Sequence, residues 1–161
     1  MTKPMADERS LIVVDPWHEQ NPWGGKNQFK IYTEDGQPYH GASTYSENLE
    51  VLLRAFQGKI FVFDETTTYL KTDERIKLQG VNPVVFPTRI ESSEPLGGWD
   101  FTFDQIGSFS KNVVLAGGYL NKGNARAYWG CAGNFYRKLK KKGFEVELAK
   151  GCCYTNNGAS S

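Results

Sequence analysis

Two side chains in this sequence suit nucleophilic chemistry, one a thiol and the other a carboxylate. Cys131 stands at the predicted start of a helix, after the apolar run at residues 113–116 and a glycine-rich loop. The exposed N–H groups and the dipole of a helix N-terminus can lower the pKa of a thiol placed there. Asp15 ends a second apolar run, residues 11–15. A thiol with a carboxylate as its base can attack a carbonyl carbon.

Each of these residues also has a structural interpretation. Cys131 shares the i, i+4, i+8 spacing of a helix face with Phe135 and Leu139, so its side chain can belong to the core. The structural alternative for Asp15 is that its carboxylate only caps the loop that follows its strand. We favour a functional role for Asp15, because a carboxylate at the end of an apolar strand is seldom there for packing. For Cys131 both interpretations stay open.

Apolar strands alternate with helices along the chain. Strands are expected at residues 11–15, 59–64, 83–86, 113–116 and 144–148, and helices at 44–56, 73–79, 99–109 (capped by Asp100) and 132–142. Helical crossovers between apolar strands are typical of a parallel sheet with helices on both faces. We therefore predict one domain spanning residues 1–161, a three-layer α/β/α fold. Its parallel sheet has about five strands in the order 3-2-1-4-5.

This strand order also predicts where a ligand would bind. In open parallel sheets, ligands occupy the crevice beyond the carboxyl ends of the strands, where the strand order reverses. Here the reversal falls between the first and fourth strands. Asp15 ends the first strand, and Cys131 opens the helix after the fourth. The fold would thus bring the acid and the thiol to one crevice.

Composition narrows the class of protein. The formal net charge of +1 gives no reason to expect nucleic acid or a membrane surface as partner. No apolar run approaches the roughly 20 residues that span a bilayer, and residues 1–10 lack the apolar core of a secretory signal. The three cysteines, two of them adjacent, do not form a disulfide framework. We expect a cytoplasmic protein.

Several segments resemble the isochorismatase-like cysteine hydrolases. Residues 11–15 (LIVVD) resemble the first motif of that family, and residues 131–148 resemble its nucleophile helix and following strand with matching spacing. Residues 151–153 (GCC) fall where the family has a segment of small residues. As an order of elements, the resemblance covers most of the chain. It implies a homo-oligomer, because members of the family often assemble and share site residues between subunits.

The resemblance also implies a mechanism. The family uses an aspartate, a lysine and a cysteine, typically to hydrolyse small amides. By this resemblance Asp15 takes the proton of Cys131, the thiolate attacks a carbonyl, and backbone N–H groups around Gly130 hold the oxyanion. Arg89 follows the third strand, where the family has its lysine, and Lys71 is an alternative cation. For Arg89 a surface or salt-bridging role is an equal alternative.

The substrate implied is a small amide-bearing or nucleotide-derived metabolite. The residues expected to bind it lie in loops near the crevice and are Trp17, Trp23, Lys71, Gly118, Tyr119, Trp129 and Gly130. Tryptophan rings among them can stack on a flat ligand. No cofactor or metal is expected, because His18 and His40 lack a clear third ligand and are interpreted as surface residues.

A different function remains open beside hydrolysis. Without the family lysine, the chain can be a non-catalytic protein that keeps the pocket and captures a small molecule without turning it over. The long loop at residues 118–130 is compatible with such a role, because it can reshape or cap the pocket. Hydrolysis and capture differ in one observable, the chemical change of the bound molecule.

Overall fold

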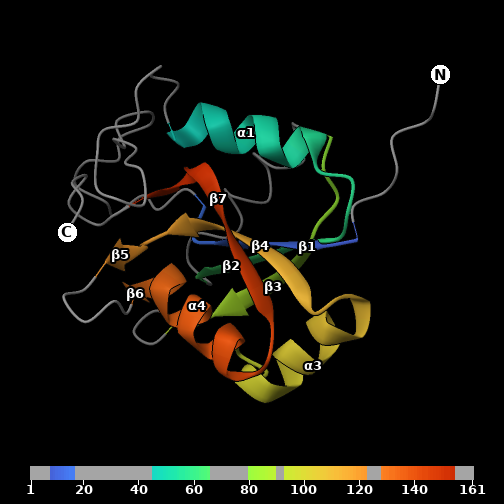
Figure 1. Ribbon diagram of the computed structural model, residues 1–161, viewed down its shortest axis with the longest axis vertical. Helices are drawn as coiled ribbons and strands as arrows, with labels where there is room; N and C mark the ends of the chain where they lie inside the picture. Colours follow the sequence, from blue (N-terminus) through green and yellow to red (C-terminus); the bar gives the residue numbers. More distant parts are fainter. Residues whose placement is uncertain (1–7, 17–44, 66–79, 90–92, 123–127, 155–161) are drawn as a thin grey trace.

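The computed structural model describes residues 8–16, 45–65, 80–89, 93–122 and 128–154 of the 161-residue chain. Five parallel strands form one sheet in the spatial order β3-β2-β1-β4-β7 (Figure 1). These strands are β1 (Ser10–Val14), β2 (Ile60–Glu65), β3 (Val84–Thr88), β4 (Asn112–Gly118) and β7 (Glu145–Tyr154). The order predicted for the five sheet strands is confirmed. The structure also contains a short antiparallel pair that was not predicted. It is formed by β5 (Asn121–Lys122) and β6 (Tyr128–Trp129), which precede β7 in the chain.

Helices cover both faces of the sheet, which confirms the predicted three layers. Helix α1 (Tyr45–Ala55) lies on one face, and α3 (Trp99–Phe109) and α4 (Cys131–Lys141) lie on the other (Figure 1). Strand β1 is buried along its whole length, as expected of a central parallel strand. Its residues Leu11 and Val13 belong to the core under α1, whereas its other apolar residues pack toward α3 and α4.

The last sheet strand is longer than predicted. The expected strand ended at Leu148, but β7 continues to Tyr154. Pairing with β4 is irregular between Leu115 and Gly117, which face Leu148 and Cys153 respectively. Extra residues in β7 at this bulge break the alternating pattern on which the prediction depended. The bulge carries the end of β7 to the carboxyl edge of the sheet.

Helices α1 and α4 begin and end within one residue of the predicted bounds, but the predicted cap of α3 is not observed. Gly98 caps α3 without a side-chain hydrogen bond, so the prediction that Asp100 caps this helix is wrong. The Asp100 carboxylate instead accepts a hydrogen bond of 2.9 Å from Lys142, at the end of α4. The predicted helix at 73–79 lies outside the described residues. Within the described ranges no helix has both the length and the apolar character needed to cross a membrane.

Candidate functional site at the carboxyl edge of the sheet

Asp15 occupies an unusual backbone conformation directly after β1. Its N–H donates a 2.8 Å hydrogen bond to the carbonyl of Phe63, which extends the β1–β2 ladder by one residue. Its φ angle is then 44°, in the left-handed region that residues other than glycine seldom adopt. The side chain is 2% exposed. A buried carboxylate on such a turn must be held by its surroundings, an arrangement that is frequent at functional sites.

Cys131 is the first residue of α4, as predicted. Its side chain is only partly buried and packs at the margin of the core under α4, whereas Phe135 and Leu139 on the same helix face are fully buried. The Cys131 thiol therefore lies at the end of the row of buried side chains on α4 and not within that row. The N–H groups of Cys131 and Ala132 belong to the first helical turn, where helix geometry supplies no acceptor within the helix.

Gly130 lets the preceding loop approach the start of α4 closely. It caps the helix with a φ of 92°, and a Cβ atom there would lie 2.6 Å from the Tyr119 carbonyl oxygen and 3.1 Å from Asn121 Nδ2. The same Tyr119 carbonyl accepts a 3.1 Å hydrogen bond from the N–H of Gly133. The buried amide of Asn121 thus stands beside the helix terminus that carries Cys131.

Tyr154 shows that the acid and the thiol lie in one neighbourhood. Its fully buried phenol has a pKa well above 10, raised first by burial and then by the charges of Tyr45, Asp15, Tyr119 and Cys131. The contacts agree: the Asp15 carbonyl accepts a hydrogen bond from the Tyr154 hydroxyl, and Gly130, next to Cys131, lies against Tyr119, whose ring meets Tyr154.

Two of the predicted substrate-binding residues pack against Tyr154. Gly118 faces Tyr154 across the β4–β7 pairing, and a side chain at Gly118 would overlap the tyrosine ring. Tyr119 is half-buried and meets the same ring edge-on, with centroids 5.3 Å apart. Trp129 ends β6 immediately before Gly130 and is 47% exposed. The roles of these residues in binding substrate stay predictions.

Arg89 and Asp15 follow strands that are separated by one strand of the sheet. Arg89 follows β3, the edge strand of the sheet, and β2 lies between β3 and β1. Its side chain is exposed, and its carbonyl accepts a 3.0 Å hydrogen bond from the Ser93 N–H. Its catalytic role stays a prediction. The other predicted positions, Trp17, Trp23 and Lys71, lie outside the described residues, as do His18 and His40.

Sequence reasoning missed several buried polar residues at this edge. Asp64 is 1% exposed near the end of β2, the strand beside β1. The signal was available, because Asp64 follows an apolar run just as Asp15 does. Thr88, at the end of β3, is also buried, and its hydroxyl has no hydrogen-bond partner in the described part of the chain. Among the described residues, no three histidine, cysteine or acidic side chains gather as a metal site.

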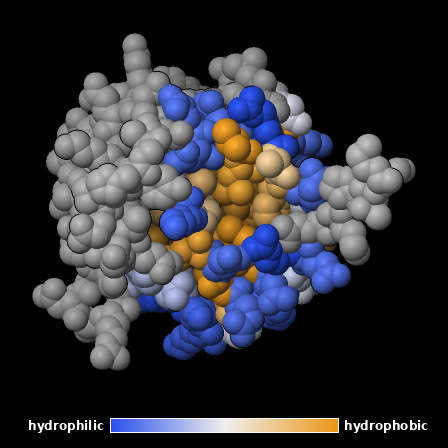
Figure 2. Space-filling view, turned by 45° about the horizontal axis from the view of Figure 1, so that its top comes forward, coloured by the Kyte–Doolittle hydropathy of each residue, from blue (hydrophilic) through white to orange (hydrophobic). Residues whose placement is uncertain are grey.

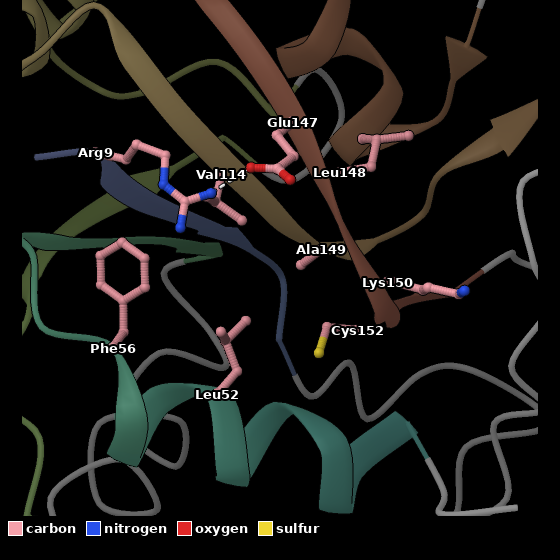
Figure 3. A pocket seen from close by; sticks show the side chains of 9 residues that line it. All are labelled: Arg9, Leu52, Phe56, Val114, Glu147, Leu148, Ala149, Lys150 and Cys152. Atoms are coloured by element: carbon pink, nitrogen blue, oxygen red, sulfur yellow. Dashed lines mark hydrogen bonds and ion pairs between the residues drawn. The ribbon is translucent and has the colours of Figure 1, made fainter. Parts of the chain in front are cut away.

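A separate apolar pocket lies on the α1 side of the sheet. It has a volume of about 240 Å³ and is lined by Arg9, Leu52, Phe56, Val114, Glu147, Leu148, Ala149, Lys150 and Cys152 (Figure 3). An ion pair between Arg9 and Glu147 crosses its rim. Figure 2 shows an apolar surface between hydrophilic borders on the side where α1 comes forward. Neither Asp15 nor Cys131 lines this pocket, so it is separate from the two candidate catalytic residues.

Comparison of the chain with known proteins finds no relative. No protein-family model, no curated protein and no solved structure matches it. The interpretation of the site therefore depends on the resemblance of particular sequence segments and on the geometry described above.

Proposed function

We propose that this protein is a cysteine-dependent hydrolase of small molecules, related to the isochorismatase-like enzymes. The observation that carries the proposal is the placement of Asp15 and Cys131. The first directly follows a central strand and is hydrogen-bonded through its carbonyl to Tyr154; the second begins a helix whose cap, Gly130, lies against Tyr119 beside the same tyrosine. The partly buried position of Cys131 favours the nucleophile over the core interpretation, because a nucleophile must be accessible to its substrate.

The proposed reaction is amide hydrolysis in two stages. Asp15 takes the proton of the Cys131 thiol, and the sulfur attacks the carbonyl carbon to form a tetrahedral intermediate. N–H groups in the first turn of α4 stabilise its oxyanion. The C–N bond then breaks, and Asp15 returns the proton to the departing amine. In the second stage Asp15 activates a water molecule that cleaves the thioester, releasing a carboxylic acid and restoring the thiol.

The substrate class proposed is a small, flat amide-bearing or nucleotide-derived molecule. Trp129 supports it, because its partly exposed ring stands at the end of β6, one residue before the helix cap. An indole in that place can stack on a flat ligand whose carbonyl lies over Cys131. We also propose that the protein works as a homo-oligomer.

A screen of small amides tests this function. The purified protein is incubated with aliphatic, aromatic and heterocyclic amides and ureido acids, and release of ammonia or of the acid product is measured. Cys131→Ala should abolish any activity found. Cys153→Ala is the matched control, because Cys153 is also partly buried but lies on β7 with its thiol hydrogen-bonded to the Leu115 carbonyl. Full activity in Cys131→Ala would refute the mechanism.

The second candidate function is capture of a small molecule without turnover. The observation that favours it is the exposed position of Arg89 beyond the edge strand, because a hydrolase of this kind needs a cation near its thiolate. Mass spectrometry of a ligand recovered after incubation separates the two functions. An unchanged ligand supports capture, and a hydrolysed ligand supports catalysis.

A further inference from the structure

Two buried tyrosine hydroxyls converge on the backbone of the turn that carries Asp15. The Tyr154 hydroxyl, at the end of β7, donates a hydrogen bond to the carbonyl oxygen of Asp15. The Tyr45 hydroxyl, at the start of α1, donates a 2.6 Å hydrogen bond to the carbonyl oxygen of Pro16. With the Asp15 N–H bound to Phe63, three elements distant in sequence hold two consecutive residues.

The turn needs this support because its conformation is intrinsically unfavourable. At a φ of 44°, the Cβ of a residue other than glycine lies too close to its own backbone. Such conformations persist where the surrounding structure fixes them. A change in the peptide units on either side of Asp15 would redirect its side chain. The Asp15 N–H and the Asp15 carbonyl belong to these two peptide units, and the Pro16 carbonyl to the next one, so the bonds to Phe63, Tyr154 and Tyr45 hold the turn.

The donors are themselves held in place. The ring of Tyr154 meets Tyr45 edge-on at a centroid distance of 4.7 Å and Tyr119 at 5.3 Å. Gly118 leaves the space that the Tyr154 ring fills. Tyr45 and Tyr154 are at most 1% exposed, so water does not compete for their hydroxyls. The raised pKa of Tyr154 keeps its hydroxyl protonated and able to donate near neutral pH.

We propose that Tyr154, assisted by Tyr45, is a positioning residue that aims the Asp15 carboxylate at the thiol of Cys131. The inference rests on the proposed function, because it assigns Asp15 the role of base. The proposal also says that Tyr154 at the end of β7 and Tyr45 at the start of α1 determine how well Asp15 acts as a base, although neither tyrosine takes part in the reaction itself.

The test compares how fast iodoacetamide alkylates Cys131 in wild type, Tyr154→Phe, Tyr45→Phe and Asp15→Asn across pH 5 to 9. Phenylalanine keeps the ring packing and removes only the hydroxyl. We expect Tyr154→Phe to slow alkylation at pH 6 by about threefold to tenfold, toward the Asp15→Asn profile, because a misplaced base loses much of its effect. Tyr45→Phe should change the profile in the same direction and by less. Tyr136→Phe is the matched control, since Tyr136 lies on α4 and packs on Tyr128.

The possible outcomes separate the two proposals. If Asp15→Asn changes the profile but both tyrosine variants match wild type, the positioning role is wrong and the hydrolase proposal stands. If Asp15→Asn matches wild type, Asp15 is not the base and both fail. If circular dichroism shows that Tyr154→Phe does not fold, Tyr45→Phe decides, and a profile identical to wild type then overturns the positioning role.

Discussion

Gly118 and Tyr154 lie opposite each other at the ends of β4 and β7, and the tyrosine ring fills the space that a Gly118 side chain would need. The absence of a side chain at Gly118 thus leaves room for a fully buried tyrosine at residue 154. Through its hydroxyl, Tyr154 then reaches the carbonyl of Asp15 on β1. The ends of three neighbouring strands are connected in this way.

Replacing Gly118 by alanine should destabilise the protein. The added methyl group would overlap the Tyr154 ring, and overpacking of this kind costs about 1 to 3 kcal/mol. For a chain of this length, such a loss lowers the melting temperature by about 2 to 4 °C per kcal/mol. Gly97→Ala is the matched control, because its methyl group would only touch Phe101 at 3.4 Å. Equal melting temperatures for the two variants would contradict this packing.

Cys152 should resist alkylation in the folded protein. Burial raises the pKa of its thiol from 9.0 to about 11, and only the thiolate reacts. Because the pKa of Cys152 is higher in the folded than in the unfolded protein, the buried neutral thiol favours the fold below pH 9.0. This stabilisation is lost as the pH rises toward 11. At pH 9 we expect labelling of Cys152 to be about tenfold or more slower in native than in denatured protein, measured by peptide mass spectrometry. Equal rates would show that the thiol is not buried.

The ion pair between Asp100 and Lys142 should stabilise the protein at neutral pH but not in strong acid. The hydrogen bond from Lys142 lowers the pKa of Asp100 below 3.8. The contribution of the ion pair to the stability of the fold is therefore present above pH 3.8 and is lost as the pH falls through the folded-state pKa of Asp100. Asp100→Asn should therefore melt below wild type at pH 7, with a difference that shrinks toward pH 3 and in high salt. Asp104→Asn should have a smaller effect, because Asp104 lies 3.7 Å from the same ammonium group. A pH-independent difference would point to packing instead of charge.

The parts of the fold with strong periodicity were predictable from sequence. The apolar run at residues 11–15 and the spacing of Phe135 and Leu139 on α4 gave a central strand and a helix in the right places. The strand order followed from parallel crossovers alone. The prediction that the cysteines form no disulfide framework agrees with the free thiols of Cys131, Cys152 and Cys153.

The features that complete the site were not predictable in the same way. The bulge in β7 has no periodic signature, so neither the extension to Tyr154 nor its contact with Asp15 could be foreseen. Asp100 has the residue type of a helix cap, but it lies inside the first turn of α3, and its partner is Lys142 at the end of α4. Such contacts arise only from tertiary packing, which local sequence patterns do not encode.

The most direct test of the central claim is the pH dependence of Cys131 alkylation by iodoacetamide in wild type and Asp15→Asn. If Asp15 takes the thiol proton while the bond to sulfur forms, the alkylation rate should follow the ionisation of that carboxyl and be substantial well below the usual thiol pKa of about 8.5. Loss of the carboxylate should slow the reaction at pH 6 by about tenfold or more. If Cys131 is unreactive in the folded protein, or titrates near the ordinary value in both proteins, it is not an activated nucleophile. Capture of a small molecule would then be the better account of this protein.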